Sequence, residues 1–271
     1  MTNPDSFSFK DFPKIREGYI DVLREGQRKR FIHGLFEADV TAVRARLREH
    51  KASAGETPSF TAFVIHCMGR AVEENKILHA MRKGRNKLVL FDEVDVSTQI
   101  EVEVDGHKIV KPHIVRAANK KSFREIHEEI RAAQVGKPEE EQKYKSMQLF
   151  LALPRFIRGI FWKIIATQPQ VFKKLGGTVG MSAIGMFADG AGWGIPISFP
   201  TLMVTLGGIG EKPGVTDGRI EICEYLSLTV SVDHDIVDGA PATRFAKRLR
   251  ELIESGYGLD SLLLSEKGNE K

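Results

Sequence analysis

A run of eleven residues with strict alternation of side-chain polarity constrains the fold most. Valine, threonine or isoleucine occupies every second position from Val94 to Val104. This period is that of a β-strand that buries one face against a core. Asp105-Gly106, which follow, are typical of a tight hairpin turn, and residues 108–115 supply a return strand. The chain is therefore expected to contain a sheet with an antiparallel hairpin.

The remaining segments combine helical and extended patterns. Helices are expected over 39–51, 57–75, 122–133, 147–166 and 240–255. Thr57 and Pro58 fit the N-cap and the first position of the second of these helices. Strands are expected over 31–40, 88–91, 178–187, 201–209, 219–222 and 226–232, with a hairpin turn at 215–218. This mixture favours an α+β or mixed α/β fold with a large sheet and flanking helices, not a TIM barrel or a dinucleotide-binding repeat.

The composition excludes several classes of protein. The 271 residues are 42% hydrophobic and 28% charged, which excludes disorder over most of the chain. The net charge of +4 is too small to indicate nucleic-acid binding. There is no apolar signal-peptide core at 1–10, no run of about 18 apolar residues and no Cys/His metal spacing. We expect a soluble cytoplasmic protein with Cys67 and Cys223 as buried free thiols.

The segment 147–166 forms a basic amphipathic helix. Six large apolar residues define one stripe of it: Phe156, Ile157, Ile160, Phe161, Ile164 and Ile165. Arg155, Arg158 and Lys163 occupy the remainder of its circumference. Such a helix could lie on a membrane surface. Packing of the stripe on the protein itself or on a partner subunit is the favoured interpretation.

The stretch 226–240 carries the clearest chemical signal. His234 follows a strand directly, Asp238-Gly239 come four residues later, and a helix then begins. A turn of this kind holds a histidine rigidly with one ring nitrogen exposed, and Asp238 can fix the turn through charge-assisted hydrogen bonds. Gly239 permits a close backbone approach. The arrangement suits a general base, although the pattern alone favours a structural histidine.

Four segments, in order, resemble the catalytic domain of the dihydrolipoamide acyltransferases of 2-oxo acid dehydrogenase complexes. Residues 233–240, DHDIVDGA, followed by Arg244-Phe245, are similar to the family signature DHRxxDGA, whose His-x-x-x-Asp-Gly core chloramphenicol acetyltransferases share. The other similar segments are 39–41, 108–122 with Glu125-Ile126, and 178–187. The resemblance covers about residues 28–255 and implies a chloramphenicol acetyltransferase-like fold.

The resemblance implies a mechanism. His234 would take the proton from a thiol of coenzyme A or dihydrolipoamide, and the thiolate would attack an acyl thioester. Ser182 would donate a hydrogen bond to the tetrahedral oxyanion, and Asp238 would hold the histidine loop, often through an arginine. Arg28 and Arg30 are both candidates for that arginine. Without the resemblance, Ser182 fits a buried strand serine bonded to backbone.

The resemblance also implies partners and a domain plan. A homo-trimer is expected, in which His234 of one chain meets Ser182 of its neighbour. Residues 1–30 would form an N-terminal arm, 31–256 the catalytic domain and 257–271 a polar tail. The arm is too short for a lipoyl domain, so no covalently bound lipoyl group is expected on this chain. Coenzyme A would serve as acyl-CoA substrate, and a lipoyl-bearing protein would act in trans.

Several positions depart from the family pattern. Asp235 stands where arginine usually follows the histidine, and His79 stands where asparagine is usual. His79 is either a structural exchange, which is favoured, or a change in the substrate pocket. Trp193, between two glycines, either lines a pocket mouth or covers the sheet. The segment 136–176 is longer than the family's link.

Three functions follow from these observations. The favoured one is an acyltransferase that moves an acyl group between coenzyme A and a second thiol or a hydroxyl. The alternative is a non-catalytic assembly or scaffold protein of the same fold, associated with complexes of the 2-oxo acid dehydrogenase type. The third is a membrane-surface protein that uses the 155–165 helix.

Overall fold

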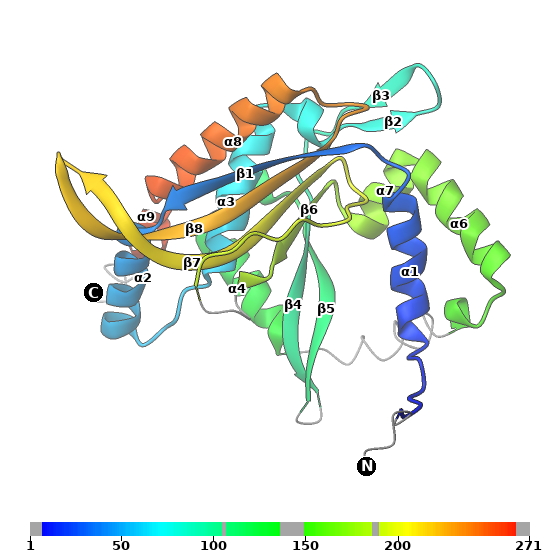
Figure 1. Ribbon diagram of the computed structural model, residues 1–271, viewed down its shortest axis with the longest axis horizontal. Helices are drawn as coiled ribbons and strands as arrows, with labels where there is room; N and C mark the ends of the chain where they lie inside the picture. Colours follow the sequence, from blue (N-terminus) through cyan, green and yellow to red (C-terminus); the bar gives the residue numbers. More distant parts are fainter. Residues whose placement is uncertain (1–6, 105–106, 136–148, 186–189, 264–271) are drawn as a thin grey trace, which may run out of the picture.

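The computed structural model describes residues 7–104, 107–135, 149–185 and 190–263. A six-stranded mixed sheet forms its centre, in the strand order β1-β8-β7-β6-β4-β5 (Figure 1). The strands are β1 (Phe31–Asp39), β4 (Val96–Val104), β5 (His107–Val115), β6 (Val179–Ala183), β7 (Leu202–Thr216) and β8 (Arg219–Asp233). A small hairpin of β2 (Met81–Lys83) and β3 (Lys87–Val89) stands apart. The mixed sheet and flanking helices expected from the sequence are confirmed.

The sheet is antiparallel at both ends and parallel in the middle. β6 pairs in parallel with β4 and β7, and the other neighbours pair antiparallel. The predicted hairpin partner of β4 is confirmed as β5, although Asp105-Gly106 lie outside the described residues. The turn between β7 and β8 is also confirmed, with positive φ at Asp217 (51°) and Gly218 (78°).

The expectation of two separate strands over 219–222 and 226–232 is wrong. β8 runs without interruption because the intervening residues stay in the ladder and have partners. Cys223 is buried, Tyr225 pairs in register with Asp39, and the Glu224 carboxylate binds Arg44 and Arg48. Between Glu224 and the turn at 217–218, the β7–β8 hairpin extends past the end of β1 (Figure 1).

The helices α3 and α8 cover one face of the sheet (Figure 1). The helices are α1 (Ile15–Gly26), α2 (Thr41–Ala54), α3 (Phe60–Glu73), α4 (Phe123–Gln134), α6 (Arg155–Thr167), α7 (Pro169–Gly176), α8 (Gly239–Glu254) and α9 (Asp260–Leu263), with short 3-10 turns η1 (Lys76–His79) and η2 (Ala118–Lys120). Phe63 of α3 and Leu249 of α8 are fully buried in the main core, which also contains Leu228 of β8. As their helical spacing predicts, four apolar residues of α8 are buried: Phe245, Leu249, Leu252 and Ile253.

The predicted N-terminus of α3 is wrong by two residues. The N-cap is Ser59, whose hydroxyl accepts from the Ala62 N–H at 3.2 Å. Contacts with α4 hold the preceding residues outside the helix. The Ser59 N–H donates to His127 Nδ1 at 3.0 Å, and Arg131 donates to the Thr57 carbonyl oxygen at 2.6 Å.

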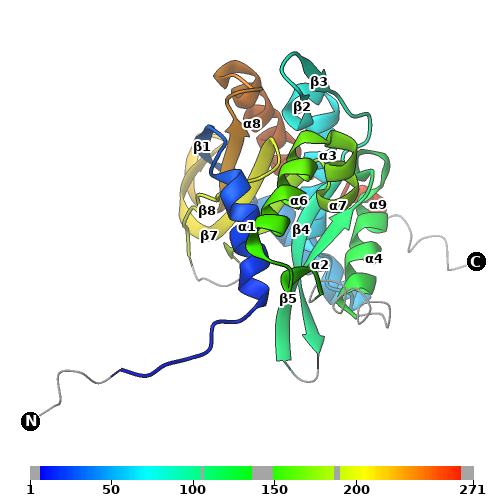
Figure 2. The same cartoon turned by 90° about the vertical axis from the view of Figure 1, so that its right-hand side faces the viewer.

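Most of the apolar stripe of the basic amphipathic helix does not pack on the described part of the chain itself, and its packing on a partner subunit stays a prediction. Of its six stripe residues only Ile165 is buried, whereas Phe156 is 70% and Ile160 57% exposed. The side chain that α6 buries beside Ile165 is Arg158. α6 packs against α1, which lies in the expected N-terminal arm (Figure 2). No helix in the described parts of the chain is long and apolar enough to cross a bilayer.

The packed part of the chain reaches beyond residue 256. Tyr257 stacks on His66 with ring centroids 5.2 Å apart, and Leu259 is buried in the main core. Residues 264–271 of the expected polar tail lie outside the described residues.

Candidate active site

His234 lies in the short connection between β8 and α8. Its backbone N–H donates to the Arg30 carbonyl oxygen at 2.7 Å, so the residue immediately before β1 fixes the position of the histidine. Its side chain is 45% exposed. Nδ1 lies 3.6 Å from Oδ1 of Asp238, which is an ion-pair distance and is too long for a strong hydrogen bond. The Nε2 edge is left for a substrate.

Asp233 organises the turn that carries the histidine. Its buried carboxylate accepts from the Asp235 N–H and lies 3.2 Å from the Lys29 ammonium. Its carbonyl oxygen accepts from the N–H groups of Ile236 and Val237, both at 3.0 Å. Burial lowers the pKa of Lys29, although the attraction of Asp233 acts in the opposite direction. The turn is therefore held by local backbone bonds and a partly buried ion pair.

The expected arginine contact to Asp238 is absent from the described residues. Arg30 instead donates to both carboxylate oxygens of Asp235, each at 2.7 Å. Arg28 pairs with Glu25 of α1. The expectation that either arginine holds Asp238 is therefore wrong, because the acidic residue after the histidine offers Arg30 a closer carboxylate.

Asp238 stands at the N-cap position of α8, but its side chain accepts no capping hydrogen bond. The side chain is 86% exposed and faces the imidazole of His234. A carboxylate at a helix N-terminus is favoured by the helix dipole. Asp238 is thus placed to orient His234 from the start of α8.

Ser182 lies on the opposite face of the sheet from α3 and α8. Its neighbour Met181 points into the main core, and strand alternation places Ser182 on the second face, where it is half-buried. In register beside it are Thr205 of β7 and then Thr229 of β8. The hydroxyls of these two threonines are buried without a hydrogen-bond partner among the described residues. A row of hydroxyl groups therefore crosses three strands.

The segment 190–197 covers this second face. Gly192 forms a bridge with Gly208 of β7. A Cβ atom on Gly208 would lie 1.8 Å from the Gly190 carbonyl oxygen, so only glycine permits this approach. Trp193 donates to the Phe36 carbonyl oxygen at 3.2 Å and lies on β1. It therefore covers the sheet, one of the two placements expected for it.

A cavity of about 590 Å³ adjoins the strand that carries Ser182. Ala183 and Leu206 line it from the sheet, and Lys51 lies on its rim. Arg44 and Arg48 also line the cavity, but both pair with Glu224. The single carboxylate of Glu224 balances one of the two arginines, so the lining of the cavity keeps an excess of positive charge.

One chain does not bring Ser182 and His234 together. Ser182 aligns with Thr229, two strands away, and His234 lies five residues farther along β8 and its extension. Spacings of 4.8 Å between strands and 3.3 Å per residue place the two about 19 Å apart. No substrate thioester could contact both residues within a single subunit.

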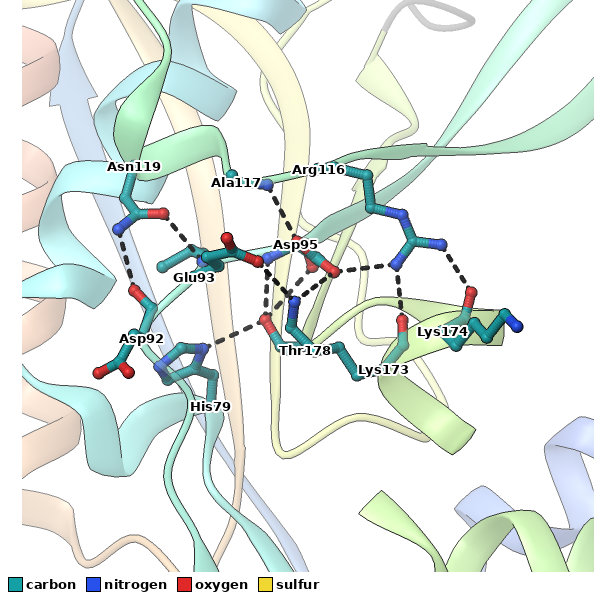
Figure 3. Close-up of polar contacts among 11 residues, drawn as sticks. His79, Asp92, Glu93, Asp95, Arg116, Ala117, Asn119, Lys173, Lys174 and Thr178 are labelled. Carbon is teal, nitrogen blue, oxygen red and sulfur yellow. Dashed lines mark hydrogen bonds and ion pairs between the residues drawn. The ribbon is translucent and has the colours of Figure 1, made fainter. Parts of the chain in front are cut away.

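A second polar cluster surrounds Asp95 (Figure 3). The buried carboxylate accepts from the Ala117 N–H and from Arg116, both at 2.9 Å, and lies 3.1 Å from the Lys173 ammonium. Burial raises the pKa of Asp95, but these hydrogen bonds outweigh it and hold the pKa below its usual value. Arg116 also donates to the carbonyl oxygens of Lys173 and Lys174 at the end of α7. The cluster ties α7 to the sheet.

His79 belongs to the same cluster (Figure 3). It is fully buried, and its Nδ1 lies 3.2 Å from the Thr178 hydroxyl. Burial lowers the pKa of His79 to about 4, so the ring is neutral at pH 7. These contacts agree with the favoured structural interpretation of His79.

Cys67 and Cys223 are free and buried, as the sequence predicts, and burial raises the pKa of the Cys67 thiol. Cys67 is therefore a poor nucleophile. Within the described ranges, no group of three or more His, Cys, Asp or Glu residues could hold a metal ion.

Comparison with known families shows which family the chain belongs to. The sequence model of 2-oxoacid dehydrogenases acyltransferase (catalytic domain) matches residues 32–148 and 169–259. The chain belongs to this family. Ser182 and His234 both lie inside the matched ranges, whereas α1 and α6 lie outside them. The expected acyltransferase family is confirmed.

Two curated relatives illustrate the match. The dihydrolipoyllysine-residue acetyltransferase component of the pyruvate dehydrogenase complex of Acholeplasma laidlawii is 34% identical over 99 residues, which are 36% of this chain and 18% of that protein. The lipoamide acyltransferase component of the branched-chain alpha-keto acid dehydrogenase complex of Bacillus subtilis is 24% identical over 227 residues, 82% of this chain and 46% of that protein. The chain spans less than half the length of either relative.

Solved structures show the same fold. A probable dihydrolipoamide acetyltransferase from Listeria monocytogenes has a TM-score of 0.68 at 19% identity, with 92% of this chain and 95% of that chain covered. The cubic core of the pyruvate dehydrogenase multienzyme complex has a TM-score of 0.66 at 18% identity, with 93% of each chain covered. The dihydrolipoamide acetyltransferase of Azotobacter vinelandii has a TM-score of 0.64 at 20% identity, again with 93% of each covered. These similarities establish the architecture.

Proposed function

We propose that this protein transfers an acyl group between coenzyme A and a second thiol or a hydroxyl. His234 acts as the general base, Ser182 as the oxyanion donor and Asp238 as the residue that orients the base. The observation that supports the proposal most is the separation along the sequence between Ser182, His234 and Asp238. The Azotobacter vinelandii enzyme was studied for the catalytic role of a serine, a histidine and an asparagine, separated by 52 and 4 residues. Ser182, His234 and Asp238 have the same two separations on the same fold.

His234 takes the proton of the attacking thiol on its exposed imidazole nitrogen. The thiolate adds to the carbonyl carbon of the acyl thioester, and the carbonyl oxygen gains the negative charge. A hydrogen bond from the Ser182 hydroxyl stabilises that oxyanion. The tetrahedral intermediate then expels the second sulfur, which takes the proton back from His234. One thioester is broken, another is formed, and the proton returns without an external acid.

The active form we propose is a homo-trimer with sites between subunits. His234 and Ser182 are about 19 Å apart in one chain by sheet register. Cyclic symmetry would bring His234 of one subunit to Ser182 of the next and repeat the site three times. The half-buried Ser182, at the end of the hydroxyl row, then faces the partner's histidine turn.

The acceptor we favour is a dihydrolipoyl group carried by another protein in the cytoplasm, with a small hydroxyl compound as the other possibility. The names of the relatives support the first, since they are dihydrolipoyllysine-residue or lipoamide acyltransferases. Coenzyme A is the other acyl carrier.

The test measures release of free coenzyme A by chromatography, since transfer between thiols conserves the total thiol count. Acetyl-, succinyl- and branched-chain acyl-CoA are each incubated with dihydrolipoamide or with hydroxyl acceptors. We expect acceptor-dependent release that His234→Ala abolishes and that Ser182→Ala lowers by about 10²–10³.

A non-catalytic assembly role is the second candidate, and Asp235 favours it. This residue places a carboxylate next to the base where the family usually has arginine, and Arg30 is occupied in neutralising it. A trimeric protein that releases no coenzyme A with any acceptor would support this role and contradict the first.

A further inference from the structure

The outward face of α6 is apolar, and its inward face carries a charge. Phe156, Ile160 and Ile164 are each more than half exposed. Toward the protein, α6 presents Arg158, which pairs with Asp21 at 2.7 Å and Glu17 at 2.8 Å. A water-facing helix has the reverse arrangement. The α6 face, defined here as Phe156, Ile157, Ile160, Phe161 and Ile164, is therefore left without a cover by the described residues.

The charge of this region has one sign. Residues 149–176 contain five Lys or Arg residues and no Asp or Glu. Arg158 forms an ion pair with Asp21, and Lys173 forms one with Asp95. Arg155 and Lys163 are exposed and make no ion pair within the described part of the chain. At about 100° per residue, Lys163 lies next to Phe156 at the edge of the α6 face, and Arg155 lies about 80° farther round the helix, where it lines a groove towards α1.

α1 and the residues just after it line the other side of the groove beside α6, and their arginines there pair with Asp21 and Glu25. Arg24 and Arg28 line, together with Arg155 and Lys163, this groove of about 280 Å³ between the two helices. Asp21 and Glu25 also line the groove, but each is paired with an arginine. α1 and α6 lie side by side at one end of the molecule (Figure 2). Neither helix belongs to the part of the chain that the family shares.

We propose that the α6 face docks on the surface of an anionic lipid bilayer. Its apolar side chains enter the boundary between headgroups and acyl chains, and Lys163 at its edge and Arg155 farther round the helix contact lipid phosphates. An apolar face with aromatic residues, bordered by cations, is the arrangement that holds a helix in the plane of a membrane. A second copy of this chain would bring the same positive charges together, so charge favours the lipid surface as occupant.

Vesicle flotation tests the proposal with the full chain. Vesicles of phosphatidylcholine with about 30% phosphatidylglycerol are compared with pure phosphatidylcholine vesicles, at low and high salt. We expect binding to the anionic vesicles that high salt weakens. Arg155→Glu with Lys163→Glu should lower the affinity at least about tenfold. Phe156→Ser with Ile160→Ser should lower it by a similar factor at either salt concentration.

Matched controls change the same chemistry elsewhere. Ile220→Ser with Ile222→Ser removes two exposed isoleucines from the β7–β8 hairpin. Arg85→Glu with Lys87→Glu reverses two exposed charges near β3. Both control proteins should float like the wild type. Circular dichroism and thermal unfolding verify that all variants are folded.

Three results would overturn the proposal. Wild-type protein could fail to float with anionic vesicles. It could float equally well after both α6 changes. The Phe156→Ser, Ile160→Ser protein could show a smaller oligomer by light scattering while the wild type binds no vesicles, which would assign the α6 face to a second copy.

Discussion

Arg30 and Asp235 form a two-pronged ion pair directly beside His234, with both nitrogen–oxygen distances at 2.7 Å. The same Arg30 accepts the His234 N–H through its backbone oxygen. The residue that neutralises Asp235 therefore also positions the base. The family usually has a positive charge directly after the histidine. This chain has the negative Asp235 there, and Arg30, immediately before β1, supplies the positive charge.

Reversing one member of this pair should impair turnover more than stability. Asp235→Arg places two guanidinium groups side by side. Their repulsion displaces Arg30, whose carbonyl oxygen holds the His234 N–H, so kcat should fall about tenfold or more. The free energy of unfolding should change by less than about 1 kcal/mol, because Arg30 is exposed. The double exchange Arg30→Asp, Asp235→Arg restores the pair and should recover most of kcat. A double variant as slow as the single one would contradict a positioning role.

Subunit sharing of the site predicts complementation. His234→Ala and Ser182→Ala proteins should each be nearly inactive alone. Co-expressed in equal amounts, they should form mixed trimers in which one interface of three holds both intact residues, and about a quarter of wild-type activity should return. A doubly substituted His234→Ala, Ser182→Ala chain mixed with either single variant is the control and should restore nothing. Absence of recovery in verified mixed trimers would contradict a site that is shared between neighbouring subunits.

His79 predicts a pH-dependent term in stability. Burial lowers its pKa to about 4, whereas the unfolded chain takes up the proton near pH 6.5. Its contribution is fully present above about pH 6.5 and is lost as the pH falls toward 4, with a slope of up to about 1.4 kcal/mol per pH unit. Urea unfolding of wild type and His79→Asn between pH 4 and 7.5 measures the difference. Parallel stability curves for the two proteins would show that His79 does not titrate in this way.

The buried pair between α1 and α6 predicts a local loss of stability. Asp21→Ala leaves the buried Arg158 with the half-exposed Glu17 and the carbonyl oxygens of Leu151 and Leu153 as partners among the described residues, and should cost about 2–4 kcal/mol. Hydrogen exchange of the α1 and α6 amides is the suitable measurement, since the main core is remote from the pair. Arg24→Ala removes a longer, exposed contact to the same carboxylate and should cost less than about 1 kcal/mol. Equal protection in both variants would contradict this account.

Elements with a strong local signal could be predicted from the sequence. The alternation from Val94 to Val104 identified β4, and the helix expected from Ser122 is α4, which begins with a capping box of Ser122 and Glu125. The local signal is insufficient where a distant residue decides the local structure. Ser59 starts α3 because His127 of α4 holds its N–H, and α6 turns its charged side inward because Asp21 of α1 binds Arg158. Hydrophobic periodicity specifies a stripe but not which side of the helix is covered.

The roles of the candidate site residues stay proposals, and their contacts could be predicted only in part. His234, Asp238 and Ser182 were identified by pattern and resemblance, and the register of β6 and β8 explains why Ser182 and His234 cannot meet in one chain. The partner of Arg30 was missed, because Asp235 and Asp238 are both within reach by sequence. The Lys29–Asp233 pair gave no local signal, since it depends on the β1–β8 pairing.

The ion pair between Arg158 and Asp21 joins two segments 137 residues apart, and both lie outside the part shared with the family. Either segment alone would leave a charged group buried without its partner, which costs several kcal/mol. The two segments are therefore expected to be inherited together. Related genes should encode both the acidic residue near the N-terminus and the arginine of the inserted helix, or neither of them.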